Sequence, residues 1–336
     1  MTAIVFVVPT DCAVWTPGEA TDLLGAEPSG TPLIVISGDQ EHAATGEILA
    51  TSMVQTSQTA RVTLPSVVVN FFTPNHAVLP RDAVYSPGRT QTETIDTLRQ
   101  GIESSREQAI ASGVRQAGIE VIEHPKLLAV RANGPSYNIL FPGDLILAID
   151  NVPMTYPSDI PAYIRGQKQV GDQVVVTVLR PGSSEEQTVT IPSLAGTSTN
   201  GNTPTMGTTP GNGYLYSPAI GFTMDVDLGD PSQGLALALA TVDLLTEDDN
   251  TAGQIVAATG VVSFEEDAST VSRVSGINEH AMSAMNAHAG LLLIPQDNCA
   301  DLTEEFPGMD IVPVATLDDA VTVVRDHSAG VPVPHC

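Results

Sequence analysis

The first candidates for chemistry are a serine just before one predicted helix and a histidine within another, both in the C-terminal half. Ser232 stands in the segment Asp230-Pro231-Ser232-Gln233-Gly234, which leads into an apolar helix predicted over Leu235 to Leu245. His280 lies in a second predicted helix, Asn278 to His288. Imidazole is the usual base for a serine nucleophile, so a Ser232–His280 pair is one hypothesis. Asp at the N-cap, Pro at N1 and Gln at N3 are also an ordinary helix start that requires no catalysis.

The histidines and cysteines predict no metal site. The chain has seven histidines, without H-E-x-x-H or another metal-ligand spacing. Its three cysteines, Cys12, Cys299 and Cys336, are far apart and include no C-x-x-C pair, which gives no support for a disulfide framework or a zinc site. Cys299 is expected to be a small buried residue. We therefore predict no metal and no cofactor. Asp225 and Asp227 alternate on a predicted strand and could orient His280, but solvated carboxylates explain them as well.

Composition narrows the classes of function. The chain has 336 residues, 13 Lys+Arg against 39 Asp+Glu, a formal net charge of -26 and 42% hydrophobic residues. This length and apolar content are enough for two or three domains with proper cores. The acidic balance argues against nucleic-acid binding and against a polybasic membrane-surface protein, because both need basic residues to neutralise phosphates. No apolar run approaches the roughly 20 residues of a membrane span.

The clearest boundary is a segment rich in Gly, Thr, Asn and Pro, Ala195 to Gly213, which predicts a flexible linker at residues 194–212. Before it, residues 121–193 show a turn at Pro142-Gly143-Asp144, a strand over Leu145 to Ile149 and a short helix over Asp159 to Gly166. A hairpin follows, with strands at 174–178 and 187–191. The run FPGDLILAIDNVPM, followed by a helix and GDQVVVTVLRPG, resembles a bacterial PDZ domain.

The PDZ resemblance implies peptide binding by strand addition at an exposed sheet edge. It places the groove between the strand Leu127–Ala132 and the helix near Ala162–Gln167. The peptide-binding residues implied are Leu127, Leu128, Ala129, Val130 and Ile164. A small β-rich domain without a ligand is the alternative.

The rest of the chain resembles the proteolytic domain of Lon-type serine peptidases. The matching residues are PSQGLALALATVDLLT, the Thr259-Gly260 pair, SGINEHAMSAMNAHAG, LLLIPQDNCADL and VPVATLDDA. Upstream, GEILATSMVQ and a predicted helix over Thr92 to Ala117 resemble the N-terminal half of that domain. The family indicated is that of the bacterial PDZ-containing Lon-like proteases, in which a PDZ module interrupts the peptidase domain.

This resemblance implies an α+β fold with four segments. They are the N-terminal half of the peptidase domain (1–120), the PDZ domain (121–193), the linker (194–212) and the C-terminal half (213–336). No G-x-x-x-x-G-K-[ST] motif occurs in the sequence, so we expect activity without ATP. The resemblance also implies an extracytoplasmic, membrane-associated protein whose anchor is absent or truncated in this chain. Unfolded, membrane or secreted protein substrates, recruited by the PDZ domain, and a homo-oligomer are implied as well.

The resemblance assigns Ser232 to the nucleophile position of a G-P-S-A-G motif and His280 to the position of the family's lysine base. The only lysines of the chain are Lys126 and Lys168, so the C-terminal half offers no amine base. Imidazole is shorter than a lysine side chain, so we expect a gap wider than hydrogen-bond reach between the two residues. The acidic composition is also expected to favour the imidazolium form, which accepts no proton. In the motif, Asp230 replaces a glycine.

Two functions therefore follow from the sequence. The first is a Lon-like, ATP-independent serine endopeptidase with PDZ recruitment, impaired because His280 replaces lysine. The second is an inactive pseudoprotease that serves as a peptide-binding or assembly protein.

Overall fold

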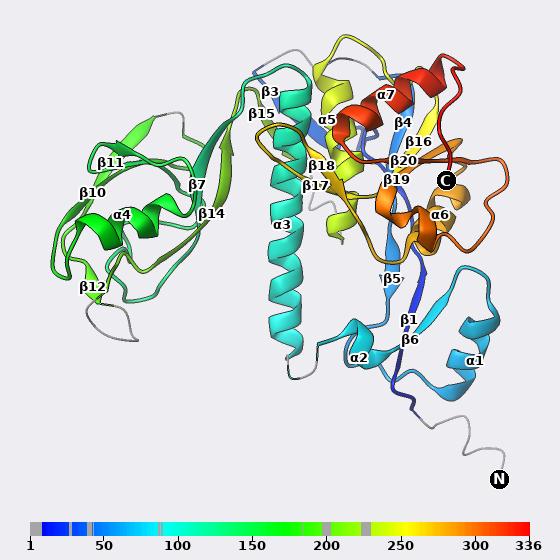
Figure 1. The fold of residues 1–336 in the computed structure, drawn as a ribbon, viewed down its shortest axis with the longest axis horizontal. Coiled ribbons are helices and arrows are strands. Elements are labelled where there is room, and N and C mark those ends of the chain that lie inside the picture. Colours follow the sequence, from blue (N-terminus) through cyan, green and yellow to red (C-terminus); the bar gives the residue numbers. More distant parts are fainter. Residues whose placement is uncertain are drawn as a thin grey trace. The chain divides into compact units, whose positions relative to one another are not determined.

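The computed structural model describes residues 9–26, 29–38, 42, 44–86, 88, 90–183, 185–196, 203–222 and 230–336. Helices and strands are mixed along the chain, which confirms the predicted α+β class. The chain divides into two compact units (Figure 1). The first combines Met1–Ile119 with Ser217–Cys336, and the second is Glu120–Tyr216. The second unit is therefore an insertion within the first.

A five-stranded sheet forms the centre of the first unit. Four of its strands run parallel, and the short first strand is antiparallel to its neighbour. All five residues of one central strand are buried, as is typical of a parallel strand covered on both faces. In sheet order the strands are β2 (Thr21–Asp22), β4 (Glu47–Ala50), β16 (Ile255–Ala258), β19 (Leu291–Pro295) and β20 (Asp310–Val314).

Helices pack on this sheet. The row Leu49, Ala257 and Leu292 belongs to one apolar cluster with buried residues of α6 (Ile277–Asn286). Helix α5 (Gly234–Leu245) is buried from Gly234 to Leu244 and contacts β4 and β16. Helix α7 (Leu317–Ser328) contacts α5 and begins with a capping box between Thr316 and Asp319.

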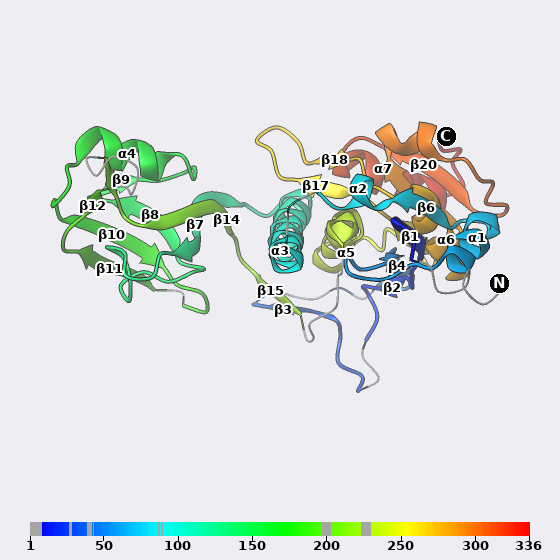
Figure 2. The same cartoon turned by 90° about the horizontal axis from the view of Figure 1, so that it is seen from below.

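The long helix α3 (Gln91–Gln116) lies against α5 (Figures 1 and 2). Its position agrees with the helix predicted over Thr92 to Ala117. At Gly113 the two helices approach so closely that a Cβ atom would stand 2.7 Å from the carbonyl oxygen of Ala238 and from Thr241. A side chain at that position would therefore push α3 away from the helix that follows Ser232.

The remaining elements of the first unit are short. A three-stranded sheet contains β5 (Met53–Gln55), β1 (Cys12–Pro17) and β6 (Ala77–Pro80), in this order. Next to β6 along the chain are α1 (Leu64–Phe72) and α2 (Arg81–Val84). Two antiparallel strand pairs also belong to this unit. They are β3 (Ile34–Ser37) with β15 (Ala219–Phe222), and β17 (Val261–Ser263) with β18 (Thr270–Ser272). The unit also contains the 3₁₀ turns η1 (Pro231–Gln233) and η2 (Gln296–Asp301).

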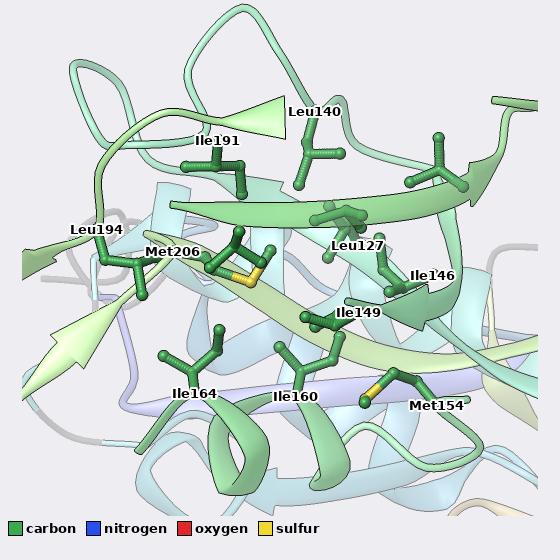
Figure 3. Close-up of a cluster of buried hydrophobic side chains, with 13 residues drawn as sticks. Leu127, Leu140, Ile146, Ile149, Met154, Ile160, Ile164, Ile191, Leu194 and Met206 are labelled. Carbon is green, nitrogen blue, oxygen red and sulfur yellow. The ribbon is translucent and has the colours of Figure 1, made fainter. Parts of the chain in front are cut away.

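The second unit has its own sheet and core. Its main sheet has the order β11 (Glu186–Ile191), β10 (Val174–Leu179), β8 (Leu145–Ile149), β7 (Ile122–Val130) and β14 (Thr208–Leu215). The short β9 (Val152–Pro153) pairs with β8, and β12 (Ala195–Gly196) pairs with β13 (Pro204–Thr205). Figure 3 shows Ile160 and Ile164 of α4 (Asp159–Gln167) pointing into a cluster of buried side chains with Leu127 and Ile149.

The predicted linker is not a free connector over its described part. Residues Thr208–Leu215 form β14, which pairs antiparallel with the full length of β7. Met206, 2% exposed, belongs to the core of the inserted unit. The unit therefore extends to Tyr216, well beyond the predicted end at residue 193. Residues 197–202 lie outside the described part.

Within the described ranges, none of the helices is long and apolar enough to cross a bilayer.

Candidate functional site

Ser232 lies in the turn η1, directly before α5. The carboxylate of Asp230 caps this turn by accepting the Ser232 N–H at 2.9 Å, as the helix-start pattern predicts. On the other side, the Gly260 N–H donates to the Ser232 carbonyl at 2.6 Å, and the Leu235 N–H donates to the Gly260 carbonyl at 2.9 Å. Ser232 is 2% exposed. The serine is thus held between the start of α5 and the loop after β16.

His280 lies on α6 and faces Ser232. The helix begins after Gly276, whose φ of +69° is left-handed and whose Cβ, if present, would meet the Met53 sulfur at 2.4 Å, so this position needs glycine. The distance from Ser232 Oγ to His280 Nε2 is 3.5 Å, a long hydrogen bond between two buried side chains. The expected gap beyond hydrogen-bond reach is therefore wrong. α6 starts close enough to the serine turn for the shorter imidazole to reach it.

Burial sets the charge state of His280. The side chain is fully buried, and this burial lowers its pKa to about 4, although the Asp230 carboxylate and the backbone of Thr51 oppose the shift. The ring is therefore neutral at pH 7 and its nitrogen is free to accept a proton. The expectation of an imidazolium is wrong, because loss of hydration outweighs the attraction of the acidic surroundings.

Sequence reasoning missed one residue of this site. The hydroxyl of Thr51, at the carboxyl end of β4, lies 2.9 Å from His280 Nδ1, on the opposite side of the ring from Ser232. Thr51 is fully buried. It lies 181 positions before Ser232 (232 minus 51), so no spacing pattern in the sequence joins the two. Only the parallel pairing of β4 with β16 brings this threonine to the site.

The backbone donors next to Ser232 are already engaged. The Ser232 N–H donates to the Asp230 carboxylate, and the Gln233 N–H donates to the Asp230 carbonyl at 3.3 Å. In serine peptidases such donors must be free to receive the oxygen that becomes negative in the transition state. Here a carboxylate already receives one of them and brings its own negative charge. This arrangement disfavours an oxyanion at the start of α5.

A cavity of about 700 Å³ opens beside Ser232. Its lining is mostly neutral and carries one acidic and one basic side chain, Asp230 and Arg273. Arg273 is paired with Asp301 at 2.6 Å. A cavity of this size next to the hydroxyl can hold the side chains of an extended peptide. Its apolar lining residues are Trp15, Met53, Ala83, Val84, Ile95, Leu98, Val261 and Val274.

The predicted peptide groove of the inserted unit needs a correction. Strand β7, which carries Leu127, Leu128, Ala129 and Val130, is an interior strand, paired with β8 on one side and with β14 on the other. Its backbone therefore offers no free edge for strand addition. Leu127 and Ile164 are core residues. β14 is the strand at the sheet edge, and a small pocket of about 120 Å³ lies between α4 and residues 203–210.

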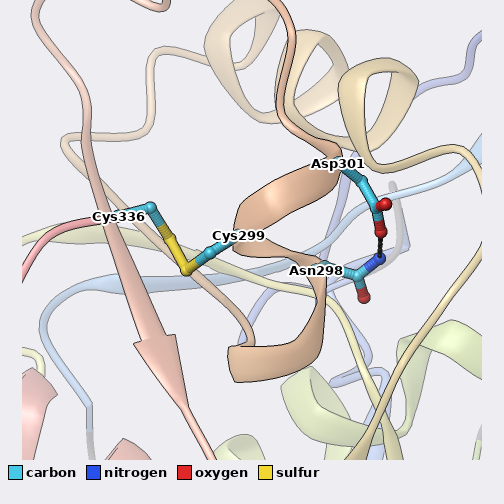
Figure 4. Close-up of a disulfide and its surroundings, with 4 residues drawn as sticks. All are labelled: Asn298, Cys299, Asp301 and Cys336. Atoms are coloured by element: carbon cyan, nitrogen blue, oxygen red, sulfur yellow. Dashed lines mark hydrogen bonds between the residues drawn. A yellow bond between two sulfur atoms is a disulfide. The ribbon is translucent and has the colours of Figure 1, made fainter.

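The two distal cysteines are joined, although their spacing gives no support for a disulfide framework, and Cys299 is only half-buried rather than a small buried residue. Cys299 in η2 and Cys336 form a disulfide across 37 positions, with a Cα–Cα distance of 5.3 Å (Figure 4). Cys12 is free. Beside the disulfide, Asn298 accepts the Val274 N–H and donates to the Val274 carbonyl, both at 2.9 Å. These bonds fix the segment that leads into α6, and hence the position of His280.

Two further expectations concern a metal site and two carboxylates. No cluster of three His, Cys, Asp or Glu side chains suited to a metal ion occurs among the residues that the structure covers. Asp225 and Asp227 lie outside the described residues, so their proposed contact with His280 is not seen or excluded.

A comparison with known protein families gives a match that covers this site of the first unit. Residues 226–324 match the family described as the Lon protease (S16) C-terminal proteolytic domain. This match includes Ser232 and His280. Among solved structures, the PDZ domain of an SdrC-like protein from Listeria monocytogenes is 28% identical, with 26% of this chain and 86% of that chain covered and a TM-score of 0.23. The PDZ domain of an SdrC-like protein from Listeria innocua is 27% identical, with 29% and 96% covered and a TM-score of 0.22.

Proposed function

We propose, from the match of residues 226–324 to the Lon protease (S16) proteolytic domain, that this protein is a Lon-like serine endopeptidase that works without ATP. Ser232 is the nucleophile and His280 is the base in this proposal. The observation that carries it is the buried contact of 3.5 Å between Ser232 Oγ and His280 Nε2, beside a cavity large enough for a peptide.

The proposed reaction has two stages. His280 Nε2 takes the proton of Ser232 as its oxygen attacks the substrate carbonyl, and the imidazolium then gives that proton to the leaving amine. Water attacks the acyl-enzyme with the same histidine as base, which releases the new carboxyl end and restores Ser232. His280 is neutral at pH 7, so it is available for the first proton transfer.

The same geometry indicates a slow enzyme. With a pKa of about 4, His280 is a weak base and binds the proton of Ser232 poorly. Proton transfer to this ring therefore stabilises the transition state only a little. The engaged N–H groups of Ser232 and Gln233 also leave little stabilisation for the oxyanion. We therefore propose an impaired peptidase whose two weaknesses are the replacement of lysine by His280 and of glycine by Asp230.

A second function is favoured by the Asp230 contact. If the N–H groups of Ser232 and Gln233 stay bonded to Asp230 when a peptide binds, they cannot stabilise an oxyanion. The peptidase unit is then a scaffold, and the protein is a pseudoprotease that binds peptides or assembles other proteins. In that case the cavity next to Ser232 holds peptide without cleaving it.

Cleavage of casein without ATP separates these functions, with wild type, Ser232→Ala and His280→Lys compared side by side. We expect slow cleavage by wild type and none by Ser232→Ala. If the wild type does not cleave casein but His280→Lys does, the peptidase scaffold is intact and lacks only an effective base. If none of the three proteins cleaves casein, although circular dichroism shows that each is folded, the peptidase proposal is contradicted and the pseudoprotease is favoured.

We also propose that the inserted unit recruits peptide or protein termini in the manner of a PDZ domain. The support is the position of β14 at the edge of the sheet and the pocket between it and α4. Arg165 of α4 lines this pocket and is exposed, so it can be changed without disturbing the core. Titration of a ¹⁵N-labelled chain with a library of C-terminal peptides tests this proposal. Shifts confined to β14 and α4, and weakened by Arg165→Glu, support it, whereas shifts at β11 contradict it.

An extracytoplasmic, membrane-associated location is the third part of the proposal. The Cys299–Cys336 disulfide supports an oxidising compartment. Helix α1 supports a lipid contact, because it carries no charged residue and leaves Val69, Phe71 and Phe72 at 64%, 69% and 77% exposure. Flotation with phosphatidylcholine vesicles tests the second point. Binding by wild type that is lost in the double variant Phe71→Ser, Phe72→Ser supports it, and no binding by wild type contradicts it.

A further inference from the structure

Three side chains form a buried row across the site. Ser232 Oγ lies 3.5 Å from His280 Nε2, and Thr51 Oγ1 lies 2.9 Å from Nδ1 of the same ring. The exposed fractions of the three residues are 2% for Ser232 and 0% for both His280 and Thr51. The histidine is therefore held between two hydroxyl groups, one at each ring nitrogen, and the shorter contact is the one to Thr51.

The chemistry of a neutral imidazole makes the second contact decisive. A neutral ring carries one proton, so one nitrogen donates a hydrogen bond and the other accepts. Nε2 can take the Ser232 proton only if the ring proton is on Nδ1, and a buried Nδ1–H needs an acceptor. We propose that Thr51 is the positioning residue of His280, whose hydroxyl oxygen accepts the Nδ1–H and so directs the Nε2 lone pair at Ser232. This inference rests on the proposed peptidase function.

The surroundings hold Thr51 firmly in place. It follows β4, whose last residue, Ala50, pairs with Ala258 of β16. The amide of Gln233 donates to the Thr51 carbonyl at 3.5 Å, and the next N–H, of Ser52, donates to the Ser283 hydroxyl on α6 at 3.4 Å. The same short segment is therefore tied to the serine turn and to the helix that carries His280. A group fixed to both partners is well placed to set the ring orientation.

The backbone of Thr51 also interacts with the ring. It raises the pKa of His280, an effect smaller than the lowering that burial causes. A threonine also carries no charge, unlike the carboxylate that holds the histidine in the Ser-His-Asp arrangement. Thr51 thus orients the ring without the negative charge of a carboxylate, and burial keeps the pKa of His280 low.

The direct test is the tautomer of His280 in the full-length chain at pH 7. The chain is labelled with ¹⁵N-histidine, and the nitrogen shifts of the ring show which atom carries the proton. His280→Gln identifies the signal. We expect the proton on Nδ1 in wild type and in Thr51→Ser, which keeps the hydroxyl, and loss of this single tautomer in Thr51→Val, which keeps only the shape. A wild-type ring protonated on Nε2, or an unchanged ring in Thr51→Val, overturns the proposal.

Kinetics supply a second readout. If wild type cleaves casein, Thr51→Val lowers kcat by roughly tenfold with KM unchanged, about the effect of one lost hydrogen bond, while Thr51→Ser stays near wild type. A rise in KM alone contradicts a positioning role. The wild-type tautomer is read without substrate and without any variant. If the chain is inactive but the ring proton is on Nδ1, the proposed peptidase function is wrong and the role of Thr51 is supported. If the chain is active but the ring proton is on Nε2, the peptidase function is supported and the role of Thr51 is wrong.

Discussion

The carboxylate of Asp230 occupies a donor that a serine peptidase needs, since it accepts the Ser232 N–H at 2.9 Å. Replacing it with glycine removes both this contact and a negative charge beside the developing oxyanion. We predict that Asp230→Gly raises the rate of casein cleavage by about tenfold or more, because one oxyanion donor contributes on the order of 10² to 10³ in kcat. The loss of the capping carboxylate costs only about 0.3 kcal/mol of stability, because glycine is itself tolerated at an N-cap.

Asp230→Asn is the matched control, because it keeps a capping oxygen but removes the charge. We expect its rate to lie between wild type and Asp230→Gly, with a smaller loss in melting temperature. Rates that are equal in all three proteins show that the donors at Ser232 do not limit cleavage, which contradicts the role assigned to Asp230.

The buried His280 also makes stability depend on pH. Its pKa is about 4 in the folded protein and about 6.5 in the unfolded chain, so the unfolded state binds more protons between these values. The free energy of unfolding is therefore highest above pH 6.5 and falls as the pH falls toward 4. The size of the loss is about 3 kcal/mol from this one group.

Urea unfolding at pH 7, 6 and 5 measures this dependence. We predict a shallower decline with falling pH in His280→Gln, whose side chain does not titrate. His335→Gln changes an exposed histidine and is the control, which should follow wild type. An identical slope for His280→Gln and wild type contradicts the assignment of a neutral buried ring.

The sequence predicted two of the three site residues and missed the third. Ser232 stands at a clear helix-start signal, and both Ser232 and His280 stand in motifs that resemble a known family. Thr51 lies in GEILATSMVQ, which also resembles that family, but a threonine after a short buried strand is common and its role depends on the parallel pairing of β4. The charge state of His280 was also mispredicted, since burial is a property of the fold rather than of composition.

At the scale of elements, strong periodicity gave correct positions. The predicted strand Leu145 to Ile149 is β8, and the helix Leu235 to Leu245 is α5 with one more residue at its start. β14 was missed, because Thr208–Leu215 is poor in β-branched apolar residues and contains Pro210 and two glycines. Such a strand depends on its partner β7 rather than on its own propensity. Its place at the sheet edge, with Pro210 at an irregular register, accommodates the missing N–H.

The disulfide ties the turn η2 to the chain's last described residue, and this connection has a measurable effect. In the chain-entropy view, closing a loop of 37 positions stabilises the fold by roughly 4 kcal/mol. We predict that Cys336→Ser lowers the melting temperature and that dithiothreitol does the same to wild type but not to the variant. Cys12→Ser, which removes the free cysteine, is the control and should respond to reductant as wild type does. A melting temperature insensitive to both changes contradicts a closed disulfide.

At the scale of the whole molecule, the net charge of -26 is the dominant property. Like charges repel one another more strongly in the compact state than in the expanded one, so the folded chain gains stability when salt screens them. The screening length falls from about 10 Å at 0.1 M to about 3 Å at 1 M salt. We predict that the melting temperature rises between 0.02 and 0.5 M NaCl, by about 2–4 °C for each kcal/mol of repulsion removed.

A charge variant separates this repulsion from other effects of salt. Glu247→Lys and Glu304→Lys change two exposed side chains and together reduce the net negative charge by four. The variant should melt higher than wild type at 0.02 M NaCl, and the difference should shrink at 0.5 M, because salt then screens the charges that the substitutions removed. Light scattering on the same samples reports any association of chains, which repulsion opposes at low salt. A melting temperature that is independent of salt in both proteins contradicts self-repulsion as a significant cost of folding.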